Sequence, residues 1–261
     1  MKVYGSMDKK YEILFNHIRS IEGRIVYRIR ALRDFGDVHA GDIGGFVETP
    51  DNLSQEGNCW IYNDGVVLGF ARIFGNAKIT DAAVISGIAD ISGGSSVMDH
   101  AIVCDNVRIC GIAMVRNRAI IQGNAHIGDR ALVIEHAVVK DDSRVSGDAV
   151  ISGDAMLAGH AIVRGAALVR GSANILDYAT IGGRALIEGD AVVADNARVF
   201  GNAKVHDRAI VCCDAWIFGD AQISGHARIA GMLRVTGKMS ICGTARLGGD
   251  RRLDMDITVD V

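Results

Sequence analysis

Residues 113–136 read AMVRNR AIIQGN AHIGDR ALVIEH when they are written in groups of six, and this pattern decides the fold. Each group starts with Ala, carries an aliphatic residue at its third position and has Asn, Gly, Asp or Glu at its fifth. The pattern runs without a break from Ala71 to Leu247. Of its thirty groups, twenty-five start with Ala, and all thirty have Ile, Val or Leu two residues later. A period this regular indicates a repeat architecture.

The six-residue period predicts a β-solenoid. Six is neither a multiple of the helical repeat nor simple strand alternation. One aliphatic, one small and one turn-forming residue per group suit a short strand followed by a bend, so that three groups, roughly eighteen residues, close one triangular coil. The fifth position, which is Gly or Asp except at Asn117, Glu135 and Cys213, would adopt the unusual backbone angles of the turn. Coils stacked as parallel strands about 4.8 Å apart give an all-β prism of about ten coils.

The flanks of the repeat differ from it and divide the chain into three parts. Residues 1–58 are expected to form an N-terminal β-hairpin cap and entry turns, since apolar and Arg residues alternate over 24–31 after a Glu22-Gly23 turn. Residues 59–249 would form the β-helix. Residues 250–261, where apolar residues alternate with acidic ones, predict a C-terminal capping strand that lies across the final coil or along a face. Caps are needed because open ends expose apolar cross-section and unpaired backbone.

Composition excludes several classes of function. The net charge of −3 argues against nucleic-acid binding, which needs a basic face. No apolar run is long enough to cross a membrane, and the first ten residues lack the apolar core of a signal peptide. Six cysteines without a CxxC spacing indicate reduced thiols in a cytoplasmic protein. The turn aspartates scatter over three corners, so no metal site is expected.

Every third group shares a face of the prism, and the outward residues next to the buried aliphatics define three faces. Two of these faces are too apolar to be left in water. Either a terminal segment covers one of them, or, as we expect, a closed homo-oligomer buries Ile102, Ile120, Val138, Leu132 and Val150. The Arg72 face carries Arg72, Asp90, Arg108, His126, Arg144, Arg198 and Arg234; the Val84 face carries Val84, Ile102, Ile120, Val138, Met156, Val192 and Ile210; the Met114 face carries Met114, Leu132, Val150, Leu168 and Leu186.

The corner between the two apolar faces, here called the histidine corner, concentrates polar residues. His100, Arg118 and His136 would stack on successive coils there, with the two histidines about 10 Å apart. Polar groups confined between apolar faces are typical of a ligand site, although a plain ladder of solvated charges is the simpler interpretation. His126, on the Arg72 face, is expected to be solvated. The corner consists of Asp81, Asp99, His100, Asn117, Arg118, Glu135, His136, Gly153 and Asp154, with Arg208 and His226 further along.

Three segments carry a resemblance to a known family: Tyr27–Leu32 (YRIRAL), Gly44–Glu48 (GGFVE) and Asn52–Gly57 (NLSQEG). Running into the Ala-x-Ile-x-Gly groups, they make the whole chain resemble the YdcK-type bacterial hexapeptide-repeat proteins, which are labelled acyltransferases. The resemblance implies a left-handed parallel β-helix, a homotrimer with a dimer as the alternative, and transfer from acetyl-CoA or another acyl-CoA to a small-molecule hydroxyl or amine. It implies His136 as general base with Glu135 nearby, His100 as the second choice, and Arg118 and Arg208 as residues that hold the CoA phosphates.

Two departures from hexapeptide acyltransferases keep other functions open. Those enzymes tend to place Gly directly after the aliphatic and commonly interrupt the coils with a long loop, whereas this chain rarely has Gly at that position and has no such interruption. Loops carry function on rigid scaffolds, so a non-catalytic β-solenoid scaffold is the main alternative. A carbohydrate- or ion-binding module is a third hypothesis. A carbonic-anhydrase-like metal enzyme is a fourth, which would need three histidines brought together between subunits.

Overall fold

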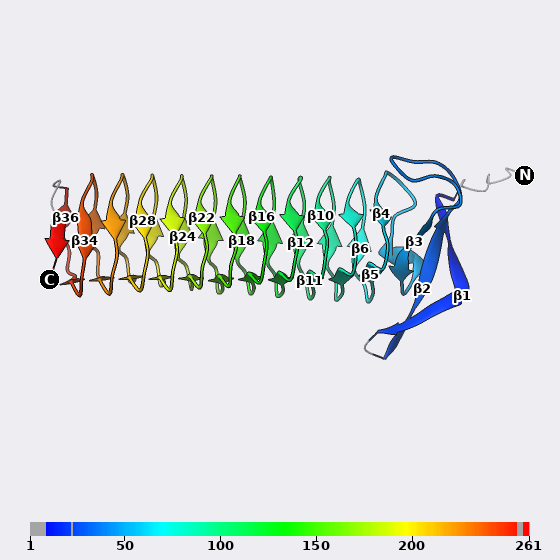
Figure 1. The fold of residues 1–261 in the computed structure, drawn as a ribbon, viewed down its shortest axis with the longest axis horizontal. Coiled ribbons are helices and arrows are strands. Elements are labelled where there is room, and N and C mark those ends of the chain that lie inside the picture. Colours follow the sequence, from blue (N-terminus) through cyan, green and yellow to red (C-terminus); the bar gives the residue numbers. More distant parts are fainter. Residues whose placement is uncertain (1–8, 22, 255–257, 261) are drawn as a thin grey trace, which may run out of the picture.

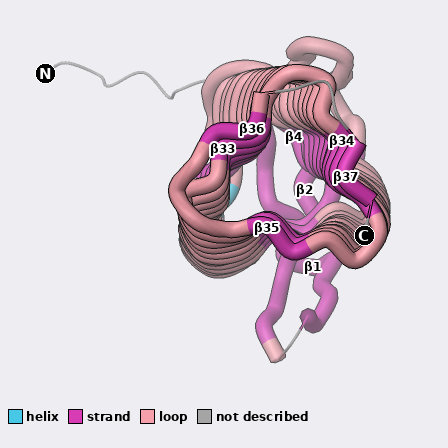
Figure 2. Tube along the Cα trace, turned by 90° about the vertical axis from the view of Figure 1, so that its left-hand side faces the viewer, coloured by secondary structure: helices cyan, strands magenta, loops and turns pink. Residues whose placement is uncertain are grey.

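The computed structural model describes residues 9–21, 23–254 and 258–260, and they form a β-solenoid of about twelve stacked turns (Figure 1). The view along its axis shows three strand-bearing sides joined by rounded corners (Figure 2). The fold class predicted from the repeat is therefore confirmed. Apart from one 3-10 turn, η1 (Pro50–Asn52), every described element is a strand. Within the described residues, no helix is long and apolar enough to span a membrane.

The sheet of the Val84 face has fourteen strands and includes the N-terminal hairpin. In spatial order these are β1 (Tyr11–Ile21), β2 (Arg24–Ala31), β3 (Ile43–Val47), β5 (Val66–Val67), β8 (Val84–Ile85), β11 (Ile102–Val103), β14 (Ile120–Ile121), β17 (Val138–Val139), β20 (Met156–Leu157), β23 (Asn174–Ile175), β26 (Val192–Val193), β29 (Ile210–Val211), β32 (Arg228–Ile229) and β35 (Arg246–Leu247).

The other two sheets contain only coil strands. The sheet of the Met114 face consists of β4 (Trp60–Ile61), β7 (Lys78–Ile79), β10 (Ser96–Val97), β13 (Met114–Val115), β16 (Leu132–Val133), β19 (Val150–Ile151), β22 (Leu168–Val169), β25 (Leu186–Ile187), β28 (Lys204–Val205), β31 (Gln222–Ile223), β34 (Ser240–Cys242) and β37 (Thr258–Asp260). The sheet of the Arg72 face consists of β6 (Arg72–Ile73), β9 (Asp90–Ile91), β12 (Arg108–Ile109), β15 (His126–Ile127), β18 (Arg144–Val145), β21 (Ile162–Val163), β24 (Thr180–Ile181), β27 (Arg198–Val199), β30 (Trp216–Ile217), β33 (Arg234–Val235) and β36 (Arg252–Leu253).

The register of these sheets is eighteen residues at every coil. Ile102 pairs with Ile120, Arg108 with His126, and Met114 with Leu132. Each residue of the repeat therefore lies directly above its equivalent in the next coil. The three faces defined from the sequence are the outward sides of the three sheets.

The core is a column of stacked aliphatic side chains closed by Ala at the corners. From Ala71 to Ile241, the aliphatic and Ala positions of the repeat are between 0 and 3% exposed. Leu233 and Met239, which replace Ala near the C-terminal end, are also buried. Burial at about 25 cal/mol per Å² of apolar surface makes this column the main source of stability.

A left-handed backbone at the fifth position of each group turns the chain at every corner. Gly occupies most of these positions with φ near +70°, and Asp, Asn, Glu or Cys occupies the others with φ between +50° and +65°. In the turns, the sixth residue donates its N–H to the carbonyl of the fifth residue one coil later, as Ala82 does to Asp99. The N–H of the fifth residue has no backbone acceptor in this ladder.

The side chains at the fifth position supply the missing acceptor. Ten carboxylate or amide oxygens each accept the N–H of the residue eighteen positions later, at 2.5–3.3 Å; they belong to Asp81, Asp99, Asp105, Asn117, Asp129, Glu135, Asp141, Asp177, Asp195 and Asp207. Asp is therefore selected here for two reasons. It tolerates the left-handed region, and it satisfies a backbone donor that would otherwise lack a protein partner.

The N-terminal hairpin covers the open first coil. Strands β1 and β2 pair antiparallel, β2 pairs antiparallel with β3, and β3 joins β5 in parallel, so the cap continues the Val84-face sheet (Figure 1). Trp60 of the first coil packs edge-on against Tyr11 and Phe35, with ring centroids 6.3 and 5.4 Å apart. These three rings close the apolar cross-section of the prism.

The turn carbonyls of the first coil have no preceding coil to donate hydrogen bonds to them. Three side chains of the cap donate these hydrogen bonds instead. At one corner, the Lys10 Nζ donates to the Cys59 carbonyl at 3.0 Å and to the Glu56 carbonyl at 3.3 Å. At the second corner, Arg28 donates to the Asn63 carbonyl at 2.6 Å. Lys10 is fully buried, so its ammonium contacts carbonyls rather than water.

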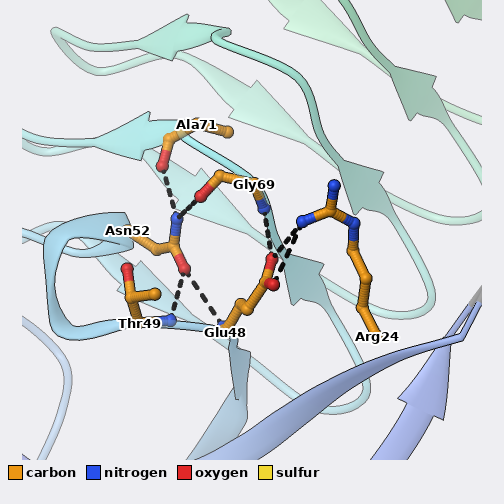
Figure 3. Close-up of polar contacts among 6 residues, drawn as sticks. All are labelled: Arg24, Glu48, Thr49, Asn52, Gly69 and Ala71. Carbon is orange, nitrogen blue, oxygen red and sulfur yellow. Dashed lines mark hydrogen bonds and ion pairs between the residues drawn. The ribbon is translucent and has the colours of Figure 1, made fainter.

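Asn52 performs this role at the third corner (Figure 3). Its amide nitrogen donates to the carbonyls of Gly69 and Ala71 at 3.1 and 2.8 Å, and its oxygen accepts the N–H groups of Glu48 and Thr49. The Glu48 carboxylate accepts the N–H of Gly69 at 2.6 Å and pairs with Arg24 at 3.1 Å. Each corner of the first coil is thus capped by one side chain.

The C-terminal residues continue the coils instead of forming the single capping strand expected for 250–261. Strand β36 extends the Arg72-face sheet beyond β33, and β37 extends the Met114-face sheet beyond β34, both in parallel. The reason is that Leu253 and Val259 keep the six-residue spacing from Leu247, and this spacing prevails over the two-residue alternation. Met255, Ile257 and Val261, which also carried the prediction, lie outside the described residues. These two strands, together with β3 and the bridge between Leu53 and Ile73 at the N-terminal end, bring the number of turns to about twelve, where about ten were predicted.

Replacing Lys10 by Met tests the cap. We expect a loss of about 2–3 kcal/mol in the free energy of unfolding, because the variant leaves buried carbonyls without a donor. Urea unfolding followed by circular dichroism measures the loss. Lys9→Met is the matched control, since Lys9 is exposed. Equal stability of the two variants would contradict the capping role.

Asp141 tests the turn. Its carboxylate accepts the N–H of Gly159 at 2.9 Å, and its φ is +59°. Asp141→Ala should cost about 1–2 kcal/mol, since it removes the acceptor and leaves a residue that disfavours this backbone conformation. Asp141→Gly should cost less than half as much, because Gly relieves the backbone and loses only the acceptor. If both substitutions destabilise equally in thermal unfolding, backbone strain plays no part.

Candidate functional site

The histidine corner is an open groove with a volume of about 880 Å³ along the edge between the Met114 and Val84 faces. It is formed by the turns that follow β7, β10, β13, β16 and β19. The residues that line it are Asp81, Asp99, His100, Asn117, Arg118, Glu135, His136, Gly153 and Asp154. The sequence therefore predicted its composition correctly, because equivalent positions stack from coil to coil.

His100, Arg118 and His136 occupy the sixth position of their groups, on successive coils. Their backbone N–H groups donate to the carbonyls of the next coil at 2.8, 2.8 and 3.0 Å. The ladder therefore fixes where each side chain leaves the backbone. With a rise of about 4.8 Å per coil, Arg118 lies on the coil between those of His100 and His136, whose backbones are about 10 Å apart.

The His136 ring contacts a carboxylate on one side only. Its Nδ1 lies 3.6 Å from Oδ1 of Asp154, on the next coil. No contact of Nε2 with another described residue is found within hydrogen-bond distance. At 3.6 Å this contact is longer than a hydrogen bond, so Asp154 interacts with the ring through its charge when the ring is protonated. A ring nitrogen without a protein partner is what a general base requires.

Arg118 makes no ion pair with any residue in the described part of the chain. The acids of the corner have partners of their own: Asp81 accepts the Thr80 hydroxyl at 2.6 Å, which lowers the pKa of the Asp81 carboxyl, and Asp99 accepts from Asn117. The guanidinium is therefore available to an anionic ligand in the groove.

Two further residues chosen from the sequence lie differently from what their roles would require. The Glu135 carboxylate accepts the N–H of Gly153 at 2.5 Å, so it belongs to the turn ladder and does not hydrogen-bond His136. Arg208 lies four coils beyond His136, about 19 Å away at the coil spacing. Its Nε is 3.5 Å from Oδ2 of Asp190, and it does not line the groove.

His126 is not the solvated side chain that we expected. It is half-buried on the Arg72 face, and its Nε2 is 3.6 Å from the Cys110 sulfur. Burial, followed by the charges of Arg108 and Arg144, lowers the pKa of His126. These three cationic or potentially cationic side chains line a second groove of about 370 Å³. Neither Arg108 nor Arg144 makes an ion pair with a described residue.

A third feature, the pair Cys212 and Cys213, was missed because the sequence was searched for spaced cysteines only. Their sulfurs are 3.8 Å apart, and a carboxylate oxygen of Asp195 lies near both. The available signal was Cys213 itself, which stands at a turn position that otherwise holds Gly, Asp, Asn or Glu.

Comparison with known proteins agrees with the resemblance carried by the motifs. Over 77 residues the chain is 34% identical to a protein of Escherichia coli (strain K12) described as "Uncharacterized acetyltransferase YdcK". The matched stretch is 29% of this chain and spans 24% of the length of that relative. No protein-family model matches the chain.

Proposed function

We propose that this chain is an acyltransferase that moves an acetyl or other acyl group from acyl-CoA to a hydroxyl or amine of a small molecule, with the histidine corner as its site. The observation that carries the proposal is the His136 imidazole in the groove, with its Nδ1 3.6 Å from a carboxylate oxygen of Asp154, beside Arg118, which makes no ion pair with a described residue. The similarity to a protein described as an acetyltransferase supports the same chemistry. A cytoplasmic location would supply acyl-CoA and keep the six thiols reduced.

In the proposed reaction, His136 accepts the proton of the acceptor hydroxyl or amine as that oxygen or nitrogen attacks the thioester carbonyl. The carbon–sulfur bond then breaks, and the CoA thiolate takes the proton from the imidazolium. Asp154 stabilises the charged ring during the reaction. Arg118 binds the CoA phosphates through charge-assisted hydrogen bonds. His100, on the other side of Arg118, is the second candidate for the base.

The His136→Gln variant tests the base. We expect kcat/KM for acetyl transfer to fall by about 10²–10⁴-fold, because Gln cannot accept the proton. An assay of CoA thiol release against a panel of hydroxyl and amine acceptors would measure it.

His160→Gln is the control. This histidine stacks on Tyr178 with ring centroids 4.7 Å apart and lies outside the groove, so its loss should not change turnover.

A wild-type protein that neither binds acetyl-CoA nor releases CoA with any acceptor would favour the scaffold hypothesis.

We further propose that the two apolar faces beside the groove bury each other in a homotrimer. The proposal rests on two continuous stripes that flank the histidine corner, Ile102, Ile120 and Val138 on one side and Leu132 and Val150 on the other. Ile102 is 43% exposed, and the other four are partly exposed. A neighbouring chain along this edge would also narrow the open groove and exclude water from it.

Charge placed on these stripes tests the assembly. Val138→Glu should convert a trimer into monomers, since a buried unpaired carboxylate costs several kcal/mol. Light scattering after size-exclusion chromatography gives the molar mass. Thr180→Glu, on the Arg72 face, should leave the trimer intact. A monomeric wild type would contradict the proposal, and so would filaments that grow with concentration.

A further inference from the structure

The turn between β29 and β30, at the corner that joins the Val84 face to the Arg72 face, brings two thiols and a carboxylate together. Cys212 and Cys213 have their sulfurs 3.8 Å apart. Asp195 lies on the equivalent turn one coil earlier, and one of its carboxylate oxygens and both sulfurs lie within 4.8 Å of one another. Cys212 is buried, whereas Cys213 is partly exposed and Asp195 is exposed, so the cluster opens to solvent at the corner.

Cys213 occupies a strained position for which the turn gives no reason. Its φ is +61°, in the region that L-residues with a Cβ disfavour. Ten other side chains held in this conformation compensate by accepting an N–H from the next coil. The Cys213 sulfur makes no such bond among the described residues; its contact is with Cys212. A strained residue whose side chain makes no compensating hydrogen bond is typical of a functional site.

The geometry of the cluster fits a tetrahedral thiophilic ion. Two thiolates bound to Zn²⁺ at about 2.3 Å lie about 3.8 Å apart, which is the separation found here. The Asp195 carboxylate is already held in place, because its Oδ2 accepts the Cys213 N–H at 2.8 Å. Ligating carboxylates in metal sites are commonly fixed by such outer hydrogen bonds.

The surroundings of the Cys212 sulfur affect how readily its thiol gives up the proton that a metal ion would replace. Burial has the largest influence and raises the pKa of the Cys212 thiol, the neighbouring Cys213 adds to this increase, and Arg228 opposes it. The Arg228 guanidinium is 3.8 Å from the Cys212 sulfur. A metal ion binds the thiolate form of cysteine, so binding releases the proton of a thiol that carries one.

We propose that Cys212, Cys213 and Asp195 bind a thiophilic divalent cation of the Zn²⁺ class in tetrahedral geometry, with the fourth position open to water or to an anionic ligand. The donor set of two sulfurs and one carboxylate oxygen suits Zn²⁺, whereas Mg²⁺ and Ca²⁺ require mainly oxygen ligands. The site lies at a different corner from the histidine groove and does not depend on acyl transfer.

Titration of the reduced full-length chain with Co²⁺, followed by competition with Zn²⁺, tests the proposal. We expect one Co²⁺ per chain, with the thiolate-to-cobalt charge-transfer absorption of a tetrahedral site, displaced by Zn²⁺. Asp195→Asn keeps an oxygen for the Cys213 N–H, and it should weaken binding by about 10- to 100-fold.

Two variants separate binding from folding. Cys213→Gly removes one sulfur and places the residue best suited to φ +61° in the turn, so it should abolish the charge-transfer band while the thermal midpoint stays equal or rises. Cys104→Ser is the matched control, because Cys104 occupies the equivalent position six coils earlier but is followed by Asp105. The proposal is overturned if the wild type binds Co²⁺ no more tightly than Cys213→Gly, or if Cys104→Ser removes the band equally.

Discussion

The structure depends on one residue in six adopting a left-handed backbone conformation. This conformation turns the chain at each corner and places every residue above the one eighteen positions earlier. It also leaves one N–H per turn outside the backbone ladder. Gly adopts this conformation without a steric clash because it has no Cβ. Asp adopts it as well, and its carboxylate accepts a hydrogen bond from that N–H. Gly and Asp therefore occur at the corners because the backbone of the turn requires them. The aspartates act there as hydrogen-bond acceptors rather than as calcium ligands.

Stacking at a fixed register makes each column of side chains a unit with its own chemistry. On the Arg72 face and at its corners, opposite charges eighteen residues apart meet directly, as in the pairs Arg72–Asp90 and Arg130–Asp148. At the histidine corner, Arg208 pairs in this way with Asp190, whereas Arg118, on the coil between His100 and His136, makes no ion pair with a described residue. Such a column presents a proton acceptor and a cation at a spacing set by the coils. In the proposed reaction, this rigid placement would take the role that a long loop has in hexapeptide acyltransferases.

The sequence predicted the periodic part of the molecule and little of the rest. The core, the three faces and the lining of the groove follow from the six-residue count, because register converts spacing into position. The caps do not follow from it, since nothing periodic indicates that Lys10, Arg28 and Asn52 each reach a carbonyl at a different corner. Glu135 was paired with His136 from adjacency in sequence, whereas the turn directs its carboxylate to Gly153. The C-terminal strands were misplaced because alternation and six-residue spacing coexist there, and only spacing matches the coil.

A crystal structure of the protein with coenzyme A tests the central claim most directly, because it locates the donor without knowledge of the acceptor. The account predicts the pantetheine arm along the histidine corner, the thiol beside Nε2 of His136, and phosphate oxygens on Arg118. Coenzyme A bound instead in the groove of Arg108, His126 and Arg144, or at neither groove at saturating concentration, would contradict it.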